Sequence, residues 1–145
     1  MTTAQEKINR FVSDTLRNNR QNEYSFVVIG DVPLKAIEEV YRKFKIDLTG
    51  YKYVIDTICV THILDKRHGV RTNDRTPLLP SELTLIPLIL TEFNSVELGN
   101  NGPNETKRLI FKKNVTSEYY YVTIQEVRHG RKSLACVSLR KRETR

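Results

Sequence analysis

The C-terminal third of the chain constrains the fold most, because its hydrophobic pattern changes from a helical period to an alternating one near Ser95. Alternation of apolar and polar residues predicts strands with one buried face, and it recurs over residues 107–113, 118–128 and 132–141. The last two segments are joined at His129-Gly130, an X-Gly pair that favours a two-residue hairpin. With a short strand over residues 96–98, the pattern predicts a mostly antiparallel sheet of about four strands.

The alternation also indicates which side chains share a face of this sheet. Apolar side chains of residues 118–128 are expected to pack together with those of residues 132–141. The first group is Tyr120, Val122, Ile124 and Val127, and the second is Leu134, Cys136 or Val137, and Leu139.

The preceding part of the chain carries helical periodicity. Apolar residues recur at spacings of three and four over residues 3–20, and again from Pro33 to a stop at residues 48–50. A further helix is predicted from Pro80, with Ser81 as its N-cap and a bend or a delay at Pro87. Short strands are expected over residues 24–29 and 51–55, and either Asp56 or Thr57 can cap the helix that follows. The fold class is therefore α+β, with N-terminal helices before the sheet.

Size and charge limit the possible partners. A chain of 145 residues suits a single domain over 1–145. Its net charge of +7 and pI near 9.5 favour a polyanionic partner, with nucleic acid ahead of an anionic membrane. The start of the chain has no apolar signal-peptide core, and the longest apolar run, residues 85–90, is too short to span a bilayer. We expect a cytoplasmic protein that does not bind membranes.

The two cysteines point to no metal or cofactor site. Cys59 and Cys136 form no CxxC motif and have no cysteine or histidine neighbour at the spacing of zinc ligands. Isolated cysteines of this kind are typical of buried thiols in a cytosolic protein. We expect no cofactor.

The stretch from Val54 to Gly69 holds two of the three histidines, His62 and His68. Histidine changes charge near neutral pH and therefore suits proton transfer. A structural interpretation stands beside this one: His68 can lie in the last turn of a helix that Gly69 closes, and His62 can be a half-buried histidine with one hydrogen bond. His129, at a hairpin tip, is interpreted as structural or facing solvent.

The order of these segments resembles a known family. The chain reads IDLTGYKYVIDTICVTHILDKRHG, then LLPSELTLIPLIL, VELG, LIFKK, YYYVTIQEV and LACVSLRKR. This order is similar to the phage-borne nuclease-like domains of the barnase–EndoU–colicin–RelE superfamily, which occur in phage head-morphogenesis proteins and polymorphic toxins. The resemblance covers residues 33–142, the nuclease-like core. It leaves residues 1–32 as an accessory helix and strand of unassigned role.

The resemblance implies a metal-independent ribonuclease of phage or toxin type. His62 and His68 become the candidate acid and base, and Ser138 stands where the family more often has threonine. Arg140 or Lys141 would then bind phosphate, and Arg71 or Arg75, on the loop after His68, could serve as well. RNA is the implied substrate, an immunity or antitoxin protein is a possible partner, and the sequence leaves the oligomeric state open.

These residues suit RNA cleavage without a metal. The reaction needs a base for the ribose 2′-OH, an acid for the leaving 5′-oxygen and cations for the phosphorane. Two histidines can share the proton transfers, and an arginine can bind the phosphate by two hydrogen bonds.

Three other interpretations remain open. The domain can be a non-catalytic nucleic-acid-binding module in which residues 119–121 offer aromatic faces for stacking. It can be a protein-interaction module that docks through its N-terminal helix. A metal site at the two histidines is the weakest alternative, because their spacing of six does not place them on one helical stripe.

Overall fold

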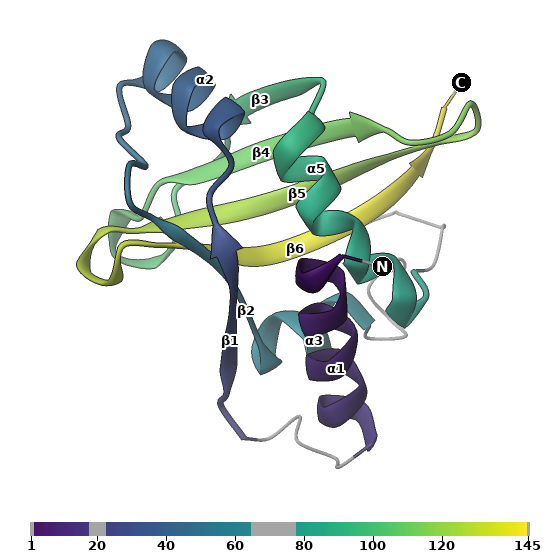
Figure 1. Ribbon diagram of the computed structural model, residues 1–145. Helices are drawn as coiled ribbons and strands as arrows, with labels where there is room; N and C mark the ends of the chain where they lie inside the picture. The colour runs from purple at the N-terminus through teal and green to yellow at the C-terminus, as the bar shows by residue number, and fades with distance from the viewer. Residues whose placement is uncertain (1, 18–22, 65–77, 145) are drawn as a thin grey trace.

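The computed structural model describes residues 2–17, 23–64 and 78–144, and it shows helices packed on a six-stranded sheet (Figure 1). The strands lie in the order β1-β2-β6-β5-β4-β3. Their bounds are β1 Phe26–Asp31, β2 Lys52–Asp56, β3 Ser95–Leu98, β4 Arg108–Asn114, β5 Tyr119–Arg128 and β6 Ser133–Glu143. The α+β class is confirmed, but the predicted number of about four strands is wrong in detail.

The two extra strands join the sheet through a parallel pair. β3, β4, β5 and β6 are antiparallel neighbours, as the alternation predicts. β2 then pairs with β6 in parallel, with Tyr53 opposite Leu134, and β1 pairs antiparallel with β2 at the edge. The sequence indicates both segments as strands, but a pairing between segments so far apart in the chain leaves no local signal.

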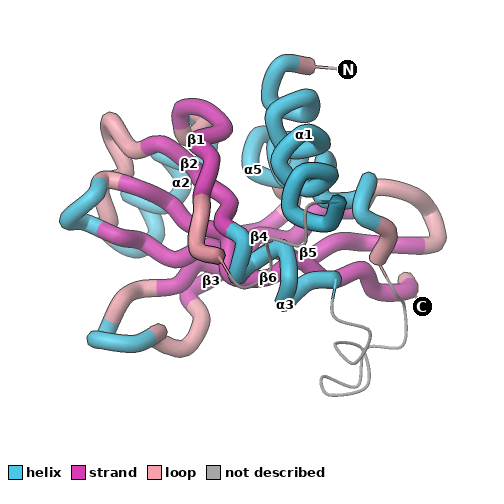
Figure 2. Tube along the Cα trace, turned by 90° about the horizontal axis from the view of Figure 1, so that it is seen from below, coloured by secondary structure: helices cyan, strands magenta, loops and turns pink. Residues whose placement is uncertain are grey.

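Helices alternate with the strands along the chain and pack on the sheet. Their bounds are α1 Thr3–Arg17, α2 Leu34–Phe44, α3 Thr57–Leu64 and α5 Ile86–Glu92, with short 3₁₀ helices η2 Pro80–Leu85, η3 Pro103–Glu105 and η4 His129–Arg131. α1 and α5 lie on the same side of the sheet (Figure 2), and α5 packs against β4 and β5. None of the helices in the described ranges is long and apolar enough to cross a membrane.

The core lies between this helical layer and the sheet. Ile86 and Ile89 of α5 are completely buried, and Phe93 contacts Phe111 edge to face at a centroid distance of 5.2 Å. Ile8 and Val12 of α1 belong to the same buried cluster. The interaction-module hypothesis uses this helix for docking, but Ile8 and Val12 on its apolar stripe are packed within the chain.

Cys59 and Cys136 are both buried, as predicted, and they lie close to each other where α3 packs against β6. The hydrogen bond with Cys136, together with burial, raises the pKa of the Cys59 thiol well above its ordinary value. The Cys59 thiol is therefore not a ready nucleophile.

Several predicted element ends differ from the structure. α2 ends at Phe44 rather than at residues 48–50, because Lys45 adopts the left-handed conformation and donates its N–H to the Tyr41 carbonyl at 2.9 Å. Asp56 caps α3 as predicted, since its Oδ1 accepts the Cys59 N–H at 2.7 Å.

Two further turn predictions are corrected. Ser81 is not an N-cap, because helical structure already begins at Pro80 and the Glu82 carboxylate accepts the Leu79 N–H. The predicted effect of Pro87 is confirmed, since the chain stays 3₁₀ as far as Leu85 and the α-helix begins at Ile86. The prediction of a two-residue turn at His129-Gly130 is wrong. A 3₁₀ turn runs to Arg131, and Lys132 adopts the positive φ.

Candidate nucleic-acid interface

Strands β4, β5 and β6 present two chemically different faces. The face toward α5 carries Tyr121, Thr123, Gln125 and Val127 of β5, all buried. The predicted face is wrong for most of β5, because Tyr120, Val122 and Ile124 alternate onto the other side and are only half-buried. The alternation gives the wrong face because the core side of β5 includes two polar residues whose side chains are hydrogen-bonded within the protein. Gln125 Nε2 donates to Thr123 Oγ1 at 2.9 Å, and Thr123 Oγ1 donates to the Ser138 carbonyl at 2.8 Å.

We refer to the second side as the open face. The strand register places the following residues on it: Arg108, Ile110, Lys112, Tyr120, Val122, Ile124, Glu126, Arg128, Ser138, Arg140 and Arg142. Its centre is apolar and half-exposed, and most of its charged groups are basic. A partly apolar floor with basic side chains around it is a surface that suits nucleic acid.

Ser138 and Arg140 are neighbours on the open face and share an unusual property. Among the described residues, only three buried side-chain polar atoms have no hydrogen-bond partner, and two of them are Ser138 Oγ and Arg140 Nε. The third, Gln125 Oε1, lies on the core side. Buried polar atoms are rarely left unpaired, since each costs about 1–3 kcal/mol. Two adjacent donors that both lack an acceptor are suited to an anion.

Other cations surround this pair. Arg140 lies opposite Val122, which in turn lies opposite Lys112, while Arg142 lies opposite Tyr120. Lys112 and Arg142 are not among the site residues predicted from sequence. Strand alternation is the signal that could have found them, because Arg140 and Arg142 are two residues apart and must share a face.

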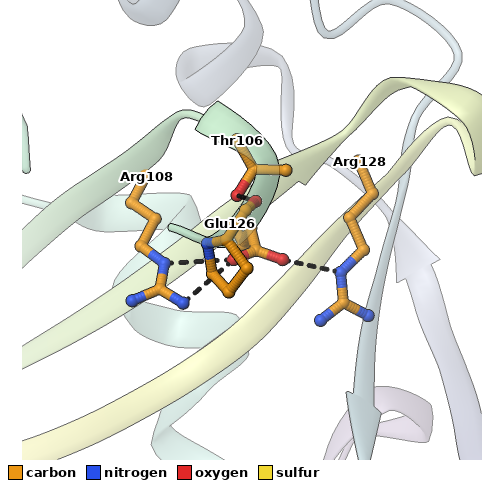
Figure 3. Close-up of polar contacts among 5 residues, drawn as sticks. Thr106, Arg108, Glu126 and Arg128 are labelled. Carbon is orange, nitrogen blue, oxygen red and sulfur yellow. Dashed lines mark hydrogen bonds and ion pairs between the residues drawn. The ribbon is translucent and has the colours of Figure 1, made fainter. Parts of the chain in front are cut away.

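Glu126 holds two further arginines in place on the same face (Figure 3). Its Oε2 accepts from Arg108 Nε at 3.0 Å, and its Oε1 accepts from Arg128 Nε at 3.0 Å. Burial acts to raise the pKa of Glu126, but hydrogen bonds from the two arginines outweigh it and lower that pKa. Glu126 thus stays ionised, and the group as a whole keeps a net positive charge.

Gly102 permits this arrangement. A Cβ atom at this position would lie 2.5 Å from both Arg108 Nε and Glu126 Oε2. The loop before β4 can therefore approach the ion pair only because residue 102 has no side chain.

Lys141 lies on the opposite face from Arg140. Its Nζ is 3.2 Å from Glu82 Oε2 and 4.4 Å from the centre of the Tyr119 ring, and Tyr121 OH also donates to Glu82. Burial and this hydrogen bond raise the pKa of Tyr121. Of the two cations offered by the sequence, Lys141 is bound to an acid on the helical side and Arg140 is the one on the open face.

The predicted histidine site is only partly covered by the structure. His62 is an exposed residue of α3. His68, Arg71 and Arg75 lie outside the described residues, so whether they approach Ser138 stays a prediction. His129 is exposed and its Nδ1 shares a hydrogen bond with Tyr51 OH, consistent with a structural role.

No group of three metal-ligating side chains occurs within residues 2–17, 23–64 and 78–144. The chemistry that the described part of the open face can supply is hydrogen bonding and positive charge, directed at an anion.

The fold and this face define an α+β domain whose open sheet face carries mostly basic charged side chains. The chain belongs to the family described as phage-Barnase-EndoU-ColicinE5/D-RelE like nuclease3, whose model matches residues 32–145. Neither the curated proteins nor the solved structures gave a significant match. The matched segment begins after β1, so α1 and β1 lie outside the family region.

Proposed function

We propose that this domain is a metal-independent ribonuclease that binds the scissile phosphate on the open face of its sheet. The family supports a nuclease, and the unpartnered Ser138 Oγ and Arg140 Nε carry the proposal for this particular site. A phosphate oxygen seated against them would complete their hydrogen bonding. Arg140, with Lys112 and Arg142 nearby, would neutralise the charge that grows on the phosphorane.

The proton transfers are assigned to His62 and His68. One takes the proton from the ribose 2′-OH, whose oxygen attacks phosphorus. The other gives a proton to the 5′-oxygen that leaves, so the products end in a 2′,3′-cyclic phosphate and a 5′-hydroxyl. The exposure of His62 on α3 is compatible with this role, because a catalytic imidazole must reach both substrate and solvent protons.

The first prediction tests this chemistry directly. The protein should cleave single-stranded RNA in EDTA and leave cyclic phosphate ends, detected by mass spectrometry of the fragments. His62→Ala and His68→Ala should each lower kcat about 10²–10⁴-fold, as expected for loss of a general acid or base. RNA that stays intact with the wild-type protein would overturn the proposal.

The second prediction uses two neighbouring cations on opposite faces. Arg140→Gln should lower kcat/KM about 10²-fold and reduce the salt slope of RNA binding by about 1, because one phosphate contact is lost. Lys141→Gln is the matched control: it should leave both unchanged and lower the unfolding free energy by about 1 kcal/mol, through loss of its contact with Glu82. Equal effects of the two variants on binding would contradict the assignment of the faces.

The alternative is a non-catalytic nucleic-acid-binding module. The basic open face supports it, because that face does not depend on the histidines. Binding that weakens steeply with salt, without cleavage and without any effect of His62→Ala, would favour this alternative.

A further inference from the structure

An aromatic pair at the start of the edge strand β1 lies beside the open face, with Phe26 in the strand and Tyr24 just before it. Tyr24 and Phe26 are 54% and 51% exposed, and their ring centroids are 6.3 Å apart. Exposing two aromatic rings together is unfavourable in water unless they have a partner. Both residues precede the segment matched by the nuclease family, so the family gives them no role.

The backbone around Tyr24 is held firmly. Thr57, at the start of α3, donates its hydroxyl to the Glu23 carbonyl at 2.7 Å and accepts the Ser25 N–H at 3.2 Å. Its own N–H donates to the Ser25 carbonyl at 2.9 Å. Three hydrogen bonds to one residue fix the segment just before β1, so the rings form a prearranged surface that loses little entropy on binding.

The strand register places this pair close to the unpartnered donors. Phe26 lies opposite Asp56 in β2, and Val54 of β2 lies opposite Ala135 in β6. Phe26 is thus level with the bulge that ends at Ser138, two strands away. Two strand spacings amount to roughly 10 Å, which about three stacked nucleotides would span at about 3.4 Å each.

Arg128 interacts electrostatically with Glu126 on the open face and with Tyr24 of the aromatic pair. Burial acts to lower the pKa of Arg128, yet its hydrogen bond with Glu126 and the nearby groups of Asp56 and Tyr24 raise it above the ordinary value. The charge of Glu126 is balanced by two arginines, and the Asp56 carboxylate is buried and caps α3. Neither acid therefore places an unbalanced negative charge between the aromatic rings and the basic open face.

We propose that Tyr24 and Phe26 form a base-stacking subsite that selects single-stranded RNA by receiving an unpaired base about three nucleotides from the phosphate held at Ser138 and Arg140. This inference rests on the proposed function, whose phosphate site it extends. An aromatic ring stacks on any base, so the subsite distinguishes unpaired from paired nucleotides rather than one base from another.

Short fluorescent oligoribonucleotides in EDTA test the subsite, with a 2′-deoxy linkage at the cleavable position to separate binding from cleavage. Tyr24→Ala and Phe26→Ala should each weaken binding at least about fivefold, and Phe26→Trp should preserve it. Tyr41→Ala is the matched control, because Tyr41 is 48% exposed on α2. An abasic series, with one base removed at each position in turn, should include a position whose loss abolishes the effect of Phe26→Ala.

The outcomes separate this inference from the proposed function. If Phe26→Ala binds as the wild type does while Arg140→Gln binds weakly, the subsite is overturned and the phosphate site stands. If the wild-type protein binds no RNA, both are overturned. If Phe26→Ala changes only the mass in solution, measured by light scattering, the aromatic pair is an interface between copies and the subsite is overturned. The thermal melting of each variant checks that it is folded.

Discussion

At the scale of single residues, the side chains of neighbouring strand positions differ in whether they have a bonding partner. Lys141 is bound by Glu82, whereas Ser138 Oγ and Arg140 Nε have no partner although they are buried. The family resemblance predicts Ser138 and Arg140 as site residues. It could not separate Arg140 from Lys141, because the choice depends on which strand face the helices cover.

Glu126 provides a third prediction, at the same scale. Glu126→Gln should lower the unfolding free energy at neutral pH by about 1–3 kcal/mol, since it removes the charge that two arginines bind. The pKa of Glu126 is lowered in the folded protein, so its contribution is present above the ordinary value of 4.5 and is lost as the pH falls through the folded value.

Urea unfolding at pH 7 and at successive steps below pH 4.5 measures this effect. The stability difference between the wild type and Glu126→Gln should shrink as the acid protonates. A difference that stays constant down to the lowest pH would show that the charge of Glu126 does not stabilise the fold.

At the scale of elements, sequence patterns predicted which segments are helices or strands better than they predicted where those segments end. Local patterns found every strand in the described ranges, because alternation is a property of the segment itself. They missed the end of α2, where Lys45 adopts a left-handed conformation that glycine would adopt more easily. They also misassigned the core face of β5, since Thr123 and Gln125 are buried as a bonded pair.

The end of α2 gives a fourth prediction. Lys45→Gly should raise the unfolding free energy by about 0.5–1 kcal/mol, because it relieves the strain of a positive φ at a side-chain-bearing residue. Glu38→Gly is the control on the exposed side of the same helix, and it should lower the free energy by about 1 kcal/mol. Urea denaturation of both variants measures the two changes, and a loss of stability in Lys45→Gly would contradict this account.

At the scale of the whole molecule, residues outside the matched family segment are part of the same core. Ile8 is completely buried, and α1 packs against β1 and η2. α1 and β1 are therefore structurally integrated with the remaining described elements, although both lie outside the family match. No pattern in residues 1–32 indicates which surface of the core it would cover.

A fifth prediction follows from this integration. Ile8→Ala should lower the unfolding free energy by about 2–5 kcal/mol, as expected for a large side chain removed from a closed core. Glu6→Ala, a change at an exposed residue two positions before Ile8 on α1, should alter it by less than about 0.5 kcal/mol. Thermal and urea unfolding distinguish the two, and an Ile8→Ala protein as stable as the wild type would show that α1 is an independent appendage.

The position of β6 has a consequence for how the protein is made. Of the six strands described in this sheet, β6 comes last in the chain, yet it lies between β2 and β5 in the middle of the sheet. Until β6 is synthesised, β2 and β5 present two separate sheet edges that have no strand to pair with. The open face, which β6 helps to form, is therefore completed only when β6 joins the sheet.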